Sequence, residues 1–145
     1  MEKISQNGLI TFTENGLVYA YLIHSNFTSE GVNFITDNNS EFQLGIMSRD
    51  ADTPVLPHLH NEIERKVKTT SEFLNFRKGK AIIRIRAHAK TEEVAFEVVQ
   101  GDSVLFTGIG IHSVDFLEPT QLLEIKQGPY DPKLDKIYLS HLEQM

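Results

Sequence analysis

The sequence predicts an all-β protein, in the form of a single-domain antiparallel β-barrel, jelly roll or sandwich. Short runs rich in β-branched and aromatic residues recur between turn residues, and the 3.6-residue periodicity of long amphipathic helices is missing. The chain has 145 residues, of which 40% are hydrophobic and 23% charged, values that are typical of a globular domain with one substantial core. About ten short strands joined by turns are expected from this pattern.

The strongest local signal is a hairpin at Asn15-Gly16. Asn-Gly between two β-rich runs favours a tight two-residue turn, and here it separates residues 9–12 from residues 17–23. Residues 81–87 alternate, with Ile83 and Ile85 on one face and Arg84 and Arg86 on the other, which predicts a half-buried antiparallel strand. Further strands are expected at residues 42–47, 72–76, 94–99, 103–106, 113–117, 122–126 and 136–142.

Charge and composition argue against several functional classes. The net charge of -6 is unfavourable for nucleic-acid binding, which depends on clustered Lys and Arg. No apolar run approaches the roughly 20 residues of a membrane span, and the N-terminus lacks the layout of a signal peptide. The absence of cysteine excludes disulfides and thiol nucleophiles. A cytoplasmic protein without a nucleic-acid or membrane partner is therefore expected.

The residues with the most informative chemistry are three histidines and a glutamate. His58 and His60 are two apart, so on a β-strand both imidazoles would leave the same face. Glu72 opens another strand-like run, and His112 follows a Gly-Ile-Gly turn. Imidazole and carboxylate ligands suit Zn, Fe, Mn or Ni. The four side chains therefore predict a site for one divalent metal ion, and a metal-free alternative makes Glu72 a general base or an orienter of a histidine.

The arrangement of these residues resembles the two motifs of the cupin superfamily. His58-Leu59-His60 matches the His-X-His of the first motif, and Glu72 stands seven residues before Gly79, as that motif requires. The gap from His60 to Glu72 is longer than usual, so Glu64, at the ordinary distance, is an alternative carboxylate ligand.

The second cupin motif is represented by Gly101 and His112, which are eleven residues apart. Thr107 replaces the proline of this motif and Phe116 its terminal asparagine. The resemblance places residues 41–130 in a motif-bearing barrel, leaves residues 1–40 as N-terminal strands outside the motifs, and makes residues 131–145 a C-terminal strand or tail. It also implies a homodimer. The segment Leu123–Tyr130, together with Asp135-Lys136, resembles small single-domain bacterial cupins, some of which are associated with surface-polysaccharide pathways.

Four further residues are candidates for substrate binding, namely Arg49, Arg65, Lys126 and Tyr130. Arg binds carboxylate or phosphate bidentately, although ordinary surface charge explains these residues equally simply. A local basic cluster has the alternation expected of the solvated face of one strand, and it comprises Arg77, Lys78, Lys80, Arg84, Arg86 and Lys90. The histidines outside the motifs are expected at the surface or at an interface, and these are His24, His88 and His141.

Three functions are compatible with this sequence. The leading hypothesis is a metal-dependent cupin enzyme acting on a small polar metabolite such as a sugar derivative, with the ion as Lewis acid or as activator of water or O2. The second is a metal-free sugar-nucleotide isomerase or epimerase that uses a histidine as base. The third is a non-catalytic module that binds a small molecule.

Overall fold

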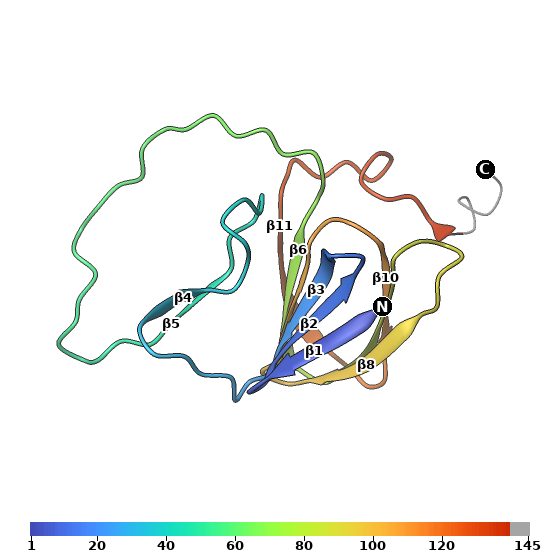
Figure 1. Ribbon diagram of the computed structural model, residues 1–145, viewed down its shortest axis with the longest axis horizontal. Coiled ribbons are helices and arrows are strands. Elements are labelled where there is room, and N and C mark those ends of the chain that lie inside the picture. The colour runs from blue at the N-terminus through green and yellow to red at the C-terminus, as the bar shows by residue number, and fades with distance from the viewer. Residues whose placement is uncertain (140–145) are drawn as a thin grey trace. The chain divides into compact units, whose positions relative to one another are not determined.

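The computed structural model describes residues 1–139 of the chain. The strands in this range are β1 (Glu2–Gln6), β2 (Leu9–Glu14), β3 (Leu17–Ile23), β4 (Val32–Phe34), β5 (Gly45–Met47), β6 (Glu72–Lys78), β7 (Lys80–Arg86), β8 (Val94–Val99), β9 (Ser103–Phe106), β10 (Ile111–Phe116) and β11 (Gln121–Lys126) (Figure 1). The chain divides into two compact units. The first contains Met1–Phe27 and the chain from Thr69 onwards, and the second is Thr28–Lys68.

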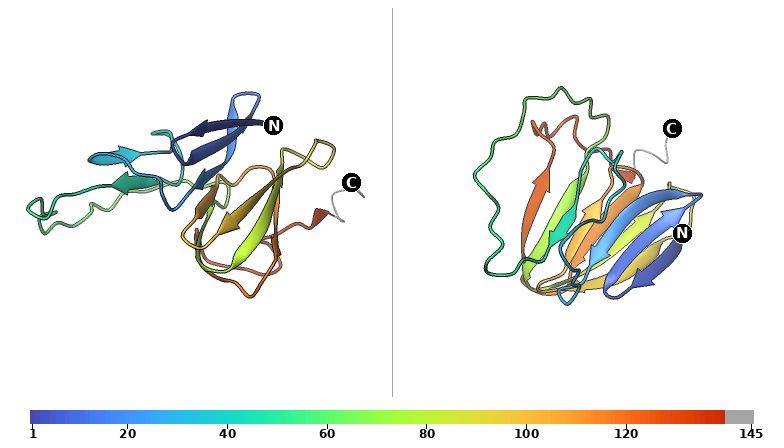
Figure 2. Two further views of the ribbon diagram at one scale, coloured as in Figure 1. Left: turned by 90° about the horizontal axis from the view of Figure 1, so that it is seen from below. Right: turned by 60° about the vertical axis from the view of Figure 1, so that its left-hand side comes forward.

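The first unit is built from two antiparallel sheets. One sheet has the strand order β1-β2-β3-β9-β6-β11, and the other has the order β10-β7-β8 (Figures 1 and 2). Side chains of both sheets share one apolar cluster, in which the rings of Phe12 on β2 and Phe96 on β8 stack with centroids 4.5 Å apart. The all-β prediction is therefore confirmed, with the two sheets packed as a sandwich.

The closed barrel, one of the predicted forms of this fold, is not present over residues 1–139. Within the described residues, β1 and β11 are the edges of the larger sheet, β10 and β8 are the edges of the smaller one, and no strand pairing joins the two sheets.

Two tight turns shape the N-terminal meander. Asn15 and Gly16 both have positive φ, 52° and 77°, and join β2 to β3, so the predicted hairpin is confirmed. Asn7 and Gly8 have the same signs of φ and join β1 to β2. Strand β1 was not predicted, because its five residues are all exposed and mostly polar, although Asn7-Gly8 is the same turn signal.

Most of the other predicted strands are present. The alternation in β7 is confirmed, since Ile83 and Ile85 are buried while Arg84 and Arg86 are only partly covered. Strands β8 and β9 have the expected bounds. Two predictions were wrong in part. The strand expected at 42–47 contains only Gly45–Met47. The strand expected at 136–142 is not formed at 136–139, where Ile137 is exposed, and its remaining residues, 140–142, lie outside the described residues.

From β6 onward the chain repeatedly crosses between the two sheets. The crossing from β6 to β7 takes place at Gly79, which has φ +91°, and a Cβ atom there would lie 2.4 Å from Thr120 Oγ1 and 2.7 Å from Thr120 Cα. Thr120 belongs to the return crossing from β10 to β11, and its hydroxyl donates to Lys80 O at 3.3 Å. Only glycine permits the two crossings to lie this close together.

The second unit contains the short hairpin of β4 and β5 and a long irregular segment. Thr36 is buried in this unit, and its hydroxyl accepts a hydrogen bond from Leu44 N at 3.0 Å. Residues 48–68 carry no strand and are drawn mainly as the green loop of Figure 1. No helix in the described part of the chain is long and apolar enough to cross a membrane.

Replacing Gly79 by alanine should destabilise the protein more than replacing Gly16. Both residues have positive φ, which costs an alanine about 1–2 kcal/mol, but a Cβ atom at Gly16 meets nothing within 4 Å. Gly79→Ala should therefore lose a further 1–3 kcal/mol, roughly, from overpacking against Thr120. Urea unfolding of both variants measures the difference, and equal losses would contradict the described crossing.

Candidate functional site

A row of four residues crosses the larger sheet and ends in a carboxylate and an ammonium group. In the strand register Ala20 on β3 lies opposite Phe106 on β9, Phe106 opposite Glu72 on β6, and Glu72 opposite Lys126 on β11. Side chains alternate along a strand, so Glu72 has the same inward orientation as the buried residue Leu74 two positions on. The apolar layer between the sheets therefore ends in a polar site.

His112 reaches this site from the opposite sheet. Its strand, β10, pairs with β7, and the imidazole stacks on the buried ring of Phe106 with centroids 3.9 Å apart and planes inclined by 7°. His112 Nε2 lies 3.7 Å from Glu72 Oε2, and the two side chains are 33% and 15% exposed. The ring of Phe106 thus fixes the plane of the His112 imidazole, and the carboxylate of Glu72 fixes the direction of its Nε2 atom. The prediction that Glu72 and His112 share a site fits this contact.

The Glu72 carboxyl is held in its ionised form. Its interaction with His112 lowers the pKa of Glu72 below the usual glutamate value, burial acts in the opposite direction, and the charges of His112, Lys136 and Lys126 lower it further. The contact with His112 therefore has a larger effect on the pKa of Glu72 than the burial of its carboxyl. The ionised form therefore stabilises the fold above the ordinary glutamate range, and that stabilisation is lost as the pH falls through the lowered pKa.

Lys126 and Tyr130, both predicted as substrate-binding residues, lie together beside this site. Lys126 Nζ is 4.6 Å from the centroid of the Tyr130 ring. The same ammonium group lies 2.9 Å from Asp135 Oδ2 and 3.3 Å from Glu124 Oε1. These carboxylates raise the pKa of Lys126, the hydrogen bond to Asp135 being the largest cause. Asp135 was not among the predicted binding residues, and its segment, residues 131–145, was expected to be a strand or tail.

His58 and His60 belong to the second unit. They lie in its irregular segment, so the expectation that both project from one face of a strand was wrong. Their rings meet edge to face with centroids 5.1 Å apart, and His58 Nδ1 contacts Leu56 O at 2.9 Å. The remaining candidates in this unit are exposed as well, and these are Arg49, Arg65 and the alternative ligand Glu64.

The four-residue metal site stays a prediction. The first unit supplies Glu72 and His112, and the second supplies His58 and His60. Over residues 1–139, neither unit by itself gathers three His, Cys, Asp or Glu side chains that could hold an ion.

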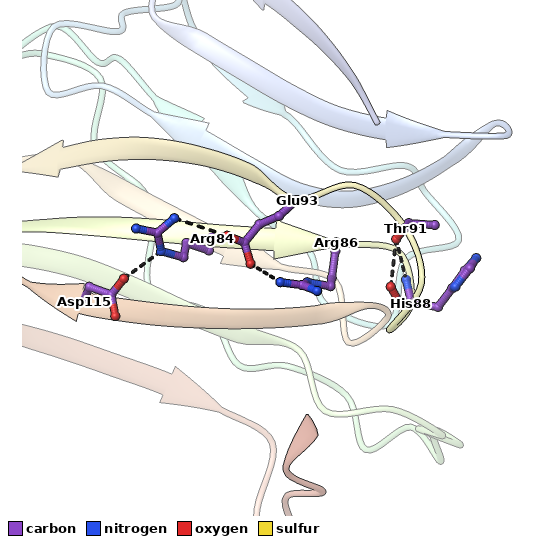
Figure 3. A network of polar contacts seen from close by, with 6 residues as sticks. All are labelled: Arg84, Arg86, His88, Thr91, Glu93 and Asp115. Carbon is purple, nitrogen blue, oxygen red and sulfur yellow. Dashed lines mark hydrogen bonds and ion pairs between the residues drawn. The ribbon is translucent and has the colours of Figure 1, made fainter. Parts of the chain in front are cut away.

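The basic cluster of the sequence is divided among several elements, and its members Lys80, Arg84 and Arg86 are paired with carboxylates. Arg84 on β7 donates to Asp115 Oδ2 at 2.7 Å and to Glu93 Oε1 at 3.2 Å, and Arg86 donates to the other oxygen of Glu93 (Figure 3). Lys80 lies 3.2 Å from Glu97. These ion pairs cover the outer face of the smaller sheet, so that its arginines are engaged with carboxylates of the chain itself.

The other histidines have different surroundings. His24 contacts the buried carboxylate of Asp102 at 3.2 Å, a partner that the sequence did not indicate. His88 is exposed and borders an open hollow of about 400 Å³ lined by Ala87, His88, Ala89, Lys90, Gly110 and Ile111. His141 lies outside the described residues.

Comparisons of this chain with protein-family models, with curated proteins and with solved structures found no match.

Replacing His112 by alanine should raise the pKa of Glu72. The substitution removes the main contact that favours the carboxylate, while much of the burial that disfavours it remains. A pH titration of the Glu72 side-chain carbon by NMR measures the shift, with His88→Ala as the matched control, because His88 is exposed on a loop outside this site. A midpoint that stays where it is in His112→Ala would rule out the described pair.

Proposed function

We propose that this chain is a cupin-like jelly-roll enzyme that acts on a small polar metabolite, such as a sugar derivative, at Glu72 and His112. The fold supports this proposal, because the chain crosses repeatedly between two antiparallel sheets from β6 to β11, with only β7 and β8 consecutive in one sheet. The motif glycines support it as well. Gly79 and Gly101 both have positive φ and lie at crossings between the sheets, Gly79 just after the strand that carries Glu72 and Gly101 just before Asp102.

The observation that carries the proposed chemistry is the fixed imidazole of His112. Glu72 faces Nε2 at 3.7 Å, which favours the tautomer with its proton on Nε2 and leaves Nδ1 as a proton acceptor. Phe106 fixes the ring plane. Such an imidazole suits the removal of a proton from a carbon next to a carbonyl group. The electron pair of the broken C–H bond then forms the enolate, and return of the proton gives the isomer or epimer.

One feature of the first unit favours this metal-free chemistry over the metal-dependent hypothesis. Lys126 lies opposite Glu72 in the strand register, and its positive charge helps to lower the pKa of that carboxyl. A neighbouring ammonium group opposes the binding of a cation.

A metal-dependent enzyme is the second candidate, and the spacing of two donor atoms favours it. The 3.7 Å between Glu72 Oε2 and His112 Nε2 is close to the separation of roughly 3.4 Å between two ligands of one tetrahedral zinc ion. Glu72 and His112 would then hold the ion together with His58 and His60. A bound ion would supply Lewis acidity toward a substrate oxygen.

The proposal predicts solvent exchange at a substrate carbon. Keto-sugar phosphates and nucleotide-linked keto-sugars are incubated with the protein in D2O, and deuterium incorporation beside the carbonyl is followed by NMR. Wild type should exchange at least one of them, and His112→Asn should lower the rate by about 10²–10⁴-fold, the usual contribution of a general base. His88→Asn is the matched control and should exchange at the wild-type rate.

The outcomes separate the three functions. Exchange that survives chelation but is lost in His112→Asn supports the base mechanism. Activity that is lost on chelation and restored by Zn, Mn, Ni or Fe(II), with metal retained by Glu64→Gln but lost from His60→Ala and Glu72→Gln, establishes the metal-dependent enzyme instead. Saturable binding without exchange indicates a non-catalytic module. Undiminished exchange in His112→Asn overturns the proposal.

A further inference from the structure

The ammonium group of Lys126 is covered by the segment that follows it in the chain. Lys126 lies at the end of β11, and residues 127–138, which we name the C-terminal strap, continue from it. The Lys126 side chain is 15% exposed and that of Asp135 is 10% exposed, with Nζ and Oδ2 2.9 Å apart. The ring of Tyr130, also on the strap, lies over the same ammonium group. The strap therefore returns to the residue from which it starts.

This ion pair is adjacent to the proposed reaction site. Lys126 lies opposite Glu72 in the strand register, and Glu72 contacts His112. Lys136, the residue after Asp135, lies near enough for its charge to lower the pKa of Glu72. The strap thus places one carboxylate and one ammonium group at the polar end of the apolar layer.

The strap is held by polar contacts more than by apolar burial. The Gln127 side chain accepts a hydrogen bond from Ser71 N at 2.7 Å, and Asp135 is bound to Lys126. The large apolar side chains of Leu134 and Ile137 are 82% and 69% exposed, so they gain little from packing. A local turn on Asp131 gives the strap its own shape, because the backbone oxygen of Asp131 accepts hydrogen bonds from Leu134 N and Asp135 N.

We propose that Lys126 is an anion subsite of this enzyme, that Asp135 occupies it in the absence of substrate, and that a carboxylate or phosphate group of the substrate displaces Asp135 and the strap. This inference rests on the proposed function, since it assigns an anionic group to the substrate of the Glu72–His112 site. The substrates expected from this subsite are small polar metabolites that carry a carboxylate or a phosphate group.

The exchange of anions is chemically reasonable at this position. Lys presents three donors on a compact charge, and phosphate offers more negative charge and more acceptor oxygens than the single Asp135 carboxylate. A tethered carboxylate competes as an intramolecular ligand with an effective concentration in the millimolar range. A substrate anion has to overcome this competition, so Asp135 weakens the binding of anions in proportion to its own occupancy.

The test measures binding of inorganic phosphate and of malonate to the full chain by isothermal titration calorimetry. Asp135→Asn should bind the preferred anion roughly tenfold more tightly than wild type, because the competing charge is removed. Lys126→Gln should lose this binding. The matched control is Asp115→Asn, which removes an exposed carboxylate bound to Arg84 on the other sheet, and it should bind like wild type.

A second measurement follows the strap itself. Trypsin cuts after Lys133 and Lys136, so cleavage there should be faster in Asp135→Asn, and it should be faster in wild type when phosphate or malonate is bound. The response to phosphate or to malonate identifies the anion. Equal affinity in wild type and Asp135→Asn, or equal tightening in Asp115→Asn, would overturn the subsite. Anion binding that follows this pattern without any solvent exchange would overturn the proposed function and leave the subsite standing.

Discussion

The first unit depends on one buried carboxylate, that of Asp102. This residue is 2% exposed, and its Oδ1 accepts hydrogen bonds from Ser25 N at 3.0 Å and from His24 Nδ1 at 3.2 Å, while its Oδ2 accepts one from Val99 N at 3.1 Å. Its backbone oxygen accepts a bond from Phe76 N at 2.9 Å. The side chain of Asp102 thus binds the residues just after β3 and the end of β8, while its backbone binds β6 and leads into β9, so this one residue links four strands from both sheets. A buried carboxylate is stable only when its oxygens are bonded in this way.

The position of the candidate site follows from the register of β9, which the contacts of Asp102 establish. Strand β9 begins directly after Asp102 and lies between β3 and β6, which places Phe106 opposite Glu72 at the far end of the strand. Phe106 then provides the flat surface on which the His112 imidazole stacks. The alternation that buries Leu74 also directs Glu72 inward, so core packing and site geometry arise from one strand periodicity. A shift of β9 by one residue would turn Phe106 outward and remove the support of the imidazole.

Local features of the fold could be predicted well, whereas contacts between distant segments could not. The Asn15-Gly16 turn and the alternation around Ile83 are determined by residues that are neighbours in the sequence, and both are present in the structure. Strand β1 was missed because a polar edge strand has no apolar face to reveal it. At the site, the spacing from the motif glycines indicated Glu72 and His112, but Asp135 and Phe106 act through tertiary contacts that no local pattern encodes. The failed strand assignment of His58 and His60 has the same origin, since spacing by two residues is compatible with a loop as well as with a strand.

The measurement that tests this account most directly is the free energy of unfolding of Asp102→Asn, with the ring resonances of Phe106 and His112 recorded on the same sample. Asparagine replaces one acceptor oxygen by an amide nitrogen, so at least one buried donor loses its partner, and a loss of about 1–3 kcal/mol is expected. The Phe106 and His112 resonances should shift, because the start of β9 is no longer fixed. Unchanged stability within about 0.5 kcal/mol, with unchanged ring resonances, would contradict the claim that the contacts of Asp102 determine the register of β9 on which the site depends.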